Sequence, residues 1–200
     1  MAAMECLSVE NRLARVNTLM IVVGSVRPGR IGLPIATWVA TAAEGEWDVD
    51  FVDLAELALP FMDEPKHPSA RAYTKQHTID WSARVDAADA IILVTPEYNH
   101  SFSPALKNAI DFLSQEWWRK PVGFVSYGGV SGGTRGVVML ESTVTGVGMV
   151  RTGASVEIPF AGKRVVDGVF TPSEKEVAVL DKVFVELTGL AAALRPLQNR

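Results

Sequence analysis

The sequence predicts an α/β fold in which helices cover both faces of one parallel β-sheet. Strand-like and helix-like segments alternate along the chain, the pattern that builds parallel sheets through β-α-β crossovers. The expected strands at 18–23 and 90–94 are almost entirely apolar, as strands covered on both faces are. With 200 residues and 48% hydrophobic content, the chain can bury the core of one domain of ordinary size.

The first half of the chain contains two expected strands and two expected helices. Glycine and proline follow the first strand, and the second strand alternates apolar with acidic residues, which predicts weaker burial. A Pro-rich segment before the second helix is longer than most connections in compact domains. In chain order we expect a strand at 18–23, a helix through 31–43, a strand at 47–52, an irregular segment at 53–68 and a weaker helix over about 70–87.

The second half carries the strongest helix signals. Ser103 is placed to cap a helix N-terminus, and Pro104 suits the first helical position. Ser173 and Glu176 form a capping box before the last periodic segment, and Pro196 is expected to stop that helix. In chain order we expect a strand at 90–94, a helix from 104 to about 114, a strand at 121–125, a helix over about 133–146, a strand at 149–156 and the C-terminal helix.

Five strands with right-handed crossovers leave few topologies. They favour the flavodoxin-like order 2-1-3-4-5, a three-layer sandwich, over the six-stranded order of dinucleotide-binding folds. In that arrangement the loops after strands one, three and four lie together at the carboxyl edge of the sheet. The same three loops carry the motifs of this chain.

Composition excludes several classes of function. The chain has 19 basic and 23 acidic residues, a formal charge of −4, with no basic run, which argues against a nucleic-acid surface. No apolar run approaches the ~20 residues that span a bilayer. A single cysteine, Cys6, excludes an internal disulfide framework and fits a reducing cytoplasm. Residues 1–17 have no apolar signal-peptide region and are interpreted as a flexible extension of a domain at 18–200.

The loop at 95–104 is the most informative motif. An apolar strand delivers Pro96, Glu97, Tyr98 and Asn99 to its carboxyl end, where open α/β sheets bind ligands. Aromatic surface, polar atoms and a Pro-restricted backbone suit a flat, hydrogen-bonding ligand better than a phosphate or a metal. His100 could touch a substrate from this loop. The three histidines of the chain show no metal-ligand spacing, so we expect no metal site.

The loops at 24–32 and 126–134 are rich in glycine. In the first, a hydroxyl from Ser25, guanidinium groups from Arg27 and Arg30, and the N–H groups opening a helix describe a phosphate site. It lacks the lysine of a P-loop, and Val26 replaces a glycine of the dinucleotide fingerprint. The other loop has four glycines and permits close backbone approach to a ligand. For each loop taken alone, a plain tight turn remains the alternative.

From about residue 18 to 156 the chain resembles the NADPH-dependent FMN reductase family, flavodoxin-like reductases of quinones, azo dyes and chromate. The shared residues are Gly24-Ser25-x-Arg27, Pro96-Glu97-Tyr98-Asn99-x-Ser101-x-Pro104 with the following Leu106–Asp111, Lys120-Pro121-Val122, and Ser126-x-Gly128-Gly129. Many members carry Ser at the position of Arg30 and Asn at that of Gly32. This chain departs from the family pattern at both positions, where an arginine could supply charge instead.

The resemblance implies a bound FMN. Its phosphate would lie on the first loop, its isoalloxazine against the second, and the third would line another edge. Glu97 and Asn99 would orient the ring, and Tyr98 would shape the face where nicotinamide and acceptor alternate. The implied cofactor-binding residues are Ser25, Arg27, Arg30, Ile31, Gly32, Pro96, Glu97, Tyr98, Asn99, Ser126, Tyr127, Gly128 and Gly129, and the implied substrate contacts are Tyr98 and His100.

The implied activity is an FMN-dependent NAD(P)H oxidoreductase. It would take electrons from NADPH or NADH and pass them to a quinone-like, azo or metal-oxyanion acceptor, or to free flavin. One alternative is a flavodoxin-like electron carrier with no nicotinamide activity; such carriers are usually strongly acidic, and a charge of −4 favours the reductase. A flavin-free binding or regulatory protein on the same fold is a third reading.

A homodimer, or a dimer of dimers, is expected from the open edge of the flavin. Excluding water from that edge needs a lid. The segment 53–68 carries Leu57, Leu59, Phe61 and Met62, which would be unfavourable to expose on a monomer. The family resemblance implies the same, since members of the family pair so that each subunit helps to wall the other's flavin site. The alternative is a segment that folds back over its own domain.

Overall fold

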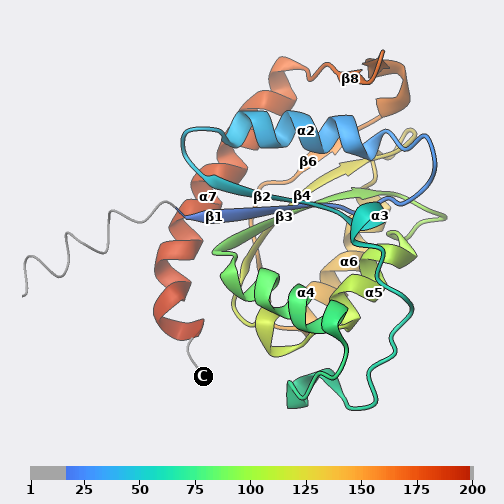
Figure 1. Ribbon diagram of the computed structural model, residues 1–200. Helices are drawn as coiled ribbons and strands as arrows, with labels where there is room; N and C mark the ends of the chain where they lie inside the picture. The colour runs from blue at the N-terminus through green and yellow to red at the C-terminus, as the bar shows by residue number, and fades with distance from the viewer. Residues whose placement is uncertain (1–16, 199–200) are drawn as a thin grey trace, which may run out of the picture.

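The computed structural model describes residues 17–198 and has a parallel sheet of order β2-β1-β3-β4-β5 at its centre (Figure 1). On one face, α2 (Gly32–Ala43) and α7 (Glu174–Gln198) pack into one apolar cluster. On the other face, α4 (Gln76–Ala87), α5 (Pro104–Asp111) and α6 (Thr134–Gly146) pack into a second. The expected three-layer fold and strand order are confirmed.

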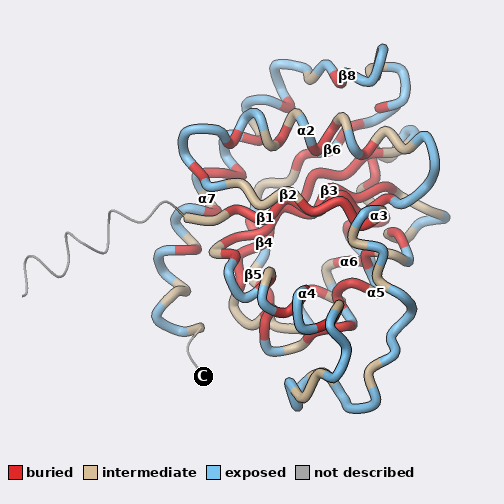
Figure 2. Tube along the Cα trace, in the orientation of Figure 1, coloured by how far each residue is buried: buried red, intermediate tan, exposed pale blue. Residues whose placement is uncertain are grey.

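The central strands are buried on both faces, as their apolar sequences predict. These are β1 (Thr18–Val23), β3 (Ala90–Pro96) and β4 (Pro121–Tyr127), which form the buried middle of the tube in Figure 2. The edge strand β2 (Asp48–Asp53) is largely half-exposed and becomes buried only near its carboxyl end. The weaker burial expected for it is confirmed.

The fifth strand is not continuous, so the prediction of one strand at 149–156 is wrong. It is divided into β5 (Val150–Arg151) and β6 (Val156–Ile158), and each pairs in parallel with β4. Between them, the backbone N–H groups of Gly153 and Ala154 donate to the carboxylate of Glu186 on α7. Because a helix side chain takes these donors, the ladder with β4 is interrupted there.

The C-terminal helix begins as predicted and ends later. The Ser173 hydroxyl accepts from the Glu176 N–H at 3.3 Å, and the Glu176 carboxylate accepts from the Ser173 N–H at 2.7 Å, which confirms the capping box. Pro196 lies inside α7, so the predicted stop is wrong. A proline near a helix end removes one backbone donor, and tertiary bonds hold this turn: Arg195 donates to Asp89 at 2.9 Å, and Gln198 to the Arg119 carbonyl at 3.0 Å.

The segment 53–68 and the elements near it are more structured than the sequence indicates. It opens with the short helix α3 (Leu54–Leu57) and leads to a 3-10 turn, η1 (Pro68–Ala70). The Glu64 carboxylate accepts from the N–H groups of Thr74 and Lys75, and α4 therefore begins at Gln76 and not near 70. An antiparallel pair, β7 (Val165–Val166) with β8 (Val169–Phe170), has no counterpart in the prediction.

Residues 1–16, which make up most of the proposed extension and include Cys6, lie outside the described part of the chain. Asn17 is described, and its carbonyl accepts from the Asp48 N–H at 3.0 Å. In the described range, none of the helices has the length and apolar character needed to cross a membrane. Nor do any three or more His, Cys, Asp or Glu side chains of residues 17–198 come together as a metal site would require.

The capping box at the start of α7 predicts a pH-dependent stability. Burial alone would raise the pKa of Glu176, but hydrogen bonds from Arg164 and from Ser173 outweigh it and hold the pKa below the usual 4.5. A lowered folded-state pKa adds stability that is complete above pH 4.5 and lost as the pH falls through the folded-state pKa. At pH 7, Glu176→Gln should therefore lower the free energy of unfolding by about 1 kcal/mol.

Urea unfolding at a series of pH values measures this difference. It should shrink steadily as the pH is lowered below 4.5, because the wild-type carboxyl group then becomes neutral. Glu174→Gln, an exposed first-turn neighbour, is the control and should change stability by no more than a few tenths of a kcal/mol. A pH-independent loss in Glu176→Gln would assign the effect to packing and not to charge.

Candidate functional site

The three motif loops meet at the carboxyl edge of the sheet, as predicted, and enclose a pocket of about 320 Å³. Nine of the predicted residues line it, and Gly29 and Gly162 complete the wall. The lining residues are Ser25, Arg27, Gly29, Arg30, Ile31, Pro96, Glu97, Tyr98, Tyr127, Gly128 and Gly162. The predicted residues outside its lining are Gly32, Asn99, His100, Ser126 and Gly129.

The two arginines of the first loop differ in their ion pairing. Arg27 is exposed and forms no ion pair with any residue in the range 17–198. Arg30 is ion-paired with Asp53, whose buried carboxylate also accepts from the Ala55 N–H at 2.9 Å and so caps α3. The positive charge of Arg30 is thus matched by Asp53, although its buried Nε has no hydrogen-bond partner among residues 17–198, and Arg27 is the arginine of this loop without an ion-pair partner there.

The start of α2 offers unoccupied backbone donors. Its N-cap residue, Ile31, makes no side-chain capping bond, and the first N–H groups of a helix have no partner within the helix. Such a terminus favours an anion. Gly32 opens the helix, and a Cβ there would lie 2.3 Å from the Tyr127 hydroxyl oxygen. The Tyr127 hydroxyl therefore occupies the space that a side chain at position 32 would need.

The second loop turns sharply just beyond β3. Tyr98 and Ser101 exchange backbone hydrogen bonds of 2.8 and 2.9 Å, and between them Asn99 and His100 have φ values of 48° and 67°. Left-handed backbone at two residues without glycine is strained, and such strain concentrates at functional sites. Asn99 and His100 are both exposed at the tip of this turn. Their predicted contacts with ring and substrate stay predictions.

Side chains tie the second loop to the first. The Ser103 hydroxyl caps α5 by accepting from the Leu106 N–H at 3.1 Å, as predicted, and itself donates to the Gly24 carbonyl. Ser25 and Tyr98 share a hydrogen bond of 2.7 Å between their hydroxyl groups. Tyr98 therefore reaches toward the first loop, and its predicted role at a substrate face stays a prediction.

The Glu97 carboxylate accepts hydrogen bonds from two residues that the sequence analysis did not identify. It accepts from Arg135 at 2.6 Å and from the Ser131 hydroxyl at 2.7 Å, which joins the second loop to the third. Desolvation opposes its ionisation, but the bonds from Arg135 and Ser131 prevail and lower the pKa of Glu97. The sequence did contain one indication that Arg135 has an acidic partner. Arg135 lies in the first turn of α6, where a positive charge is unfavourable to the helix dipole unless a carboxylate neutralises it.

The third loop depends on its glycines and on Ser126. Gly133 has φ 89°, and a Cβ there would lie 2.7 Å from the Tyr127 backbone nitrogen, so no larger residue fits. The buried Ser126 hydroxyl donates to the Gly132 carbonyl at 2.9 Å and closes the loop from within. Ser126 thus shapes the third loop without lining the pocket, while Gly128 lines it directly.

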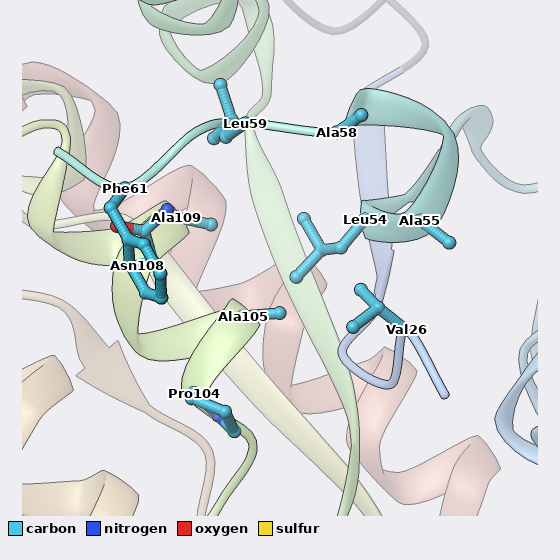
Figure 3. Close-up of a pocket in the computed structure, with 10 residues that line it drawn as sticks. All are labelled: Val26, Leu54, Ala55, Ala58, Leu59, Phe61, Pro104, Ala105, Asn108 and Ala109. Atoms are coloured by element: carbon cyan, nitrogen blue, oxygen red, sulfur yellow. The ribbon is translucent and has the colours of Figure 1, made fainter. Parts of the chain in front are cut away.

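A second, apolar pocket of about 470 Å³ lies at the same edge of the sheet, between α5 and the first half of the segment 53–68, which includes α3 (Figure 3). Leu59 packs toward the core, and Asn108 donates to the Pro60 carbonyl at 2.7 Å, so the segment does fold over its own domain. Phe61 remains 87% exposed at the mouth. The lining residues are Val26, Leu54, Ala55, Ala58, Leu59, Phe61, Pro104, Ala105, Asn108 and Ala109.

Comparisons with known proteins agree with this arrangement. The sequence model of a family described as NADPH-dependent FMN reductase matches residues 17–163. An NAD(P)H-dependent FMN reductase of Schizosaccharomyces pombe is 34% identical over 180 residues, 86% of this chain and 89% of that protein. A 2-hydroxy-1,4-benzoquinone reductase of a Burkholderia species is 33% identical over 134 residues, 64% of this chain and 68% of that protein.

Solved structures support the fold. FerB, described as a flavoenzyme NAD(P)H:(acceptor) oxidoreductase from Paracoccus denitrificans, superposes with a TM-score of 0.70 at 23% identity, covering 88% of this chain and 98% of that one. The family match over residues 17–163 covers every strand of the parallel sheet and ends before β7, β8 and α7. This protein therefore belongs to the NADPH-dependent FMN reductase family and is an oxidoreductase.

Proposed function

We propose that this protein binds FMN across the carboxyl edge of its sheet and uses it to carry electrons from NAD(P)H to a quinone-like or azo acceptor. The observation that carries the proposal is the pocket in which all three motif loops meet at an uncapped helix start. The names of relatives support the acceptor class, since they include a benzoquinone reductase and azoreductases.

The residues of the pocket fit FMN. Arg27 supplies a free positive charge, the start of α2 supplies backbone donors, and together they suit a phosphate. Bound FMN would supply the redox chemistry, taking a hydride from the nicotinamide and passing electrons to the acceptor. The protein's part is to hold and orient: the strained turn at Asn99 and His100 fixes the backbone beside the ring position, and the Glu97–Arg135 pair holds the second loop to the third.

An electron carrier without nicotinamide activity is the alternative, and one assay separates the two. Purified protein, FMN, NADPH and a benzoquinone should together oxidise NADPH well above the rate given by free FMN at the same concentration. Repeating the assay with NADH and with an azo dye defines donor and acceptor preference. FMN binding without any NADPH oxidation above the free-flavin rate would favour the carrier.

Arg27→Ala tests the phosphate end of the site. Because charge-assisted hydrogen bonds are each worth about 1.5–3 kcal/mol, this change should weaken FMN binding tenfold or more. Riboflavin lacks the phosphate, and its affinity should change little. Lys182→Ala removes a positive charge from the exposed side of α7 and should alter neither affinity. Flavin fluorescence titration measures all of these, and equal losses for FMN and riboflavin would place Arg27 away from the phosphate.

We also propose a homodimer, or a dimer of dimers, in the cytoplasm. The exposed Phe61 at the mouth of an apolar pocket supports self-association, because a large apolar side chain beside such a surface gains from being covered. The single cysteine of the sequence fits a reducing compartment.

Phe61→Ser tests the proposed dimer. Light scattering of the wild type should give a multiple of the 21.6 kDa chain mass, and the variant should shift toward that mass on dilution. Val185→Ser, which changes a 72% exposed residue on α7, should leave the mass unchanged. A wild-type mass of 21.6 kDa with full activity at the same dilution would exclude a site shared between subunits.

A further inference from the structure

The Tyr127 hydroxyl is a buried polar group without a partner. Tyr127 is only 5% exposed, and its hydroxyl oxygen makes no hydrogen bond within residues 17–198. A buried donor left unsatisfied is unfavourable, and native proteins keep few of them without a functional reason. The neighbouring hydroxyl groups of Ser25 and Tyr98 are bonded to each other, which leaves the Tyr127 group alone.

The position of this hydroxyl indicates that its missing partner is an anion. It lies against Gly32 at the first position of α2, where the backbone N–H groups are uncapped. Tyr127 also lines the pocket together with Arg27 and Ser25. A donor, a cation and a helix start therefore border the same pocket, and all three favour an anion.

Burial keeps this hydroxyl a donor. Desolvation raises the pKa of Tyr127 by more than the nearby Ser25 hydroxyl and the arginines lower it. The group is therefore protonated at neutral pH, and it can donate to a charged oxygen. A phosphate oxygen would satisfy it.

We propose that the Tyr127 hydroxyl, which occupies the space beside Gly32 at the start of α2, donates a hydrogen bond to the FMN phosphate. The assignment rests on the proposed function, and it moves Tyr127 from the ring edge to the phosphate end of the site. Tyrosine at 127 and glycine at 32 form a matched pair, because a side chain at 32 would occupy the place of the hydroxyl.

The three tyrosines of the chain allow a matched test by Tyr→Phe substitution. Tyr127→Phe should weaken FMN binding about tenfold to hundredfold, the range for a hydrogen bond to a charged group, and leave riboflavin affinity unchanged. The same variant should raise the melting temperature of the FMN-free protein, because it removes an unsatisfied buried group. A merely structural hydroxyl would not move these two quantities in opposite directions.

Tyr73→Phe is the control, since the Tyr73 hydroxyl is satisfied by Glu116 at 2.8 Å and does not line the pocket. It should lower the melting temperature and leave FMN affinity unchanged. The ³¹P resonance of bound FMN gives an independent readout, which should shift in Tyr127→Phe and stay in place in Tyr73→Phe.

Gly32→Ala tests the matched pair without any flavin. Its new Cβ would meet the Tyr127 hydroxyl, so it should lower the melting temperature, and adding Tyr127→Phe should recover part of the loss. A wild type that binds neither FMN nor riboflavin would overturn the proposed function and this assignment together. A wild type that binds FMN, with a Tyr127→Phe variant that binds it equally well, would overturn the Tyr127 assignment alone.

Discussion

The parallel pairing of β1, β3 and β4 is the constraint on which the candidate site depends. Val23, the last residue of β1, lies opposite Val94, and Val94 lies opposite Val125, so the three strands end within two residues of one another at the carboxyl edge. A slip of one residue would turn every side chain of a strand to the opposite face. Both faces of these strands are covered by helices, so the apolar packing of the core sets the level at which the three loops begin.

Hydrogen bonds between the three loops then fix their arrangement around the site. The Ser103 hydroxyl bonds the first loop, Ser25 and Tyr98 bond each other, and Glu97 bonds the third loop through Ser131. These contacts, together with the flanking strand and helix, hold the left-handed turn after Tyr98 in a conformation that isolated peptides rarely adopt. A backbone fixed in this way keeps its shape before a ligand arrives, which limits the entropy lost on binding.

Much of the fold was predictable because its signals are local. Apolar runs located three of the strands, an alternation of apolar and acidic residues located a fourth, and capping residues such as Ser103 and Ser173 located two helix starts to the residue. The errors arose where a distant residue changed the local outcome. Glu186 interrupts the fifth strand by taking its backbone donors, and Asp89 holds Arg195, and with it the turn that contains Pro196. No pattern within either segment carries that information.

The strand order, the loops that form the site and the chemical character of each loop could be predicted from the sequence. The use of individual side chains became clear only from the folded structure, in which Arg30 is paired with Asp53, Arg27 has no ion-pair partner among residues 17–198, and the Tyr127 hydroxyl lies unbonded against Gly32. The physical reason is range. Strand burial and helix capping depend on residues a few positions apart, whereas ion pairing and desolvation depend on partners that only folding brings together.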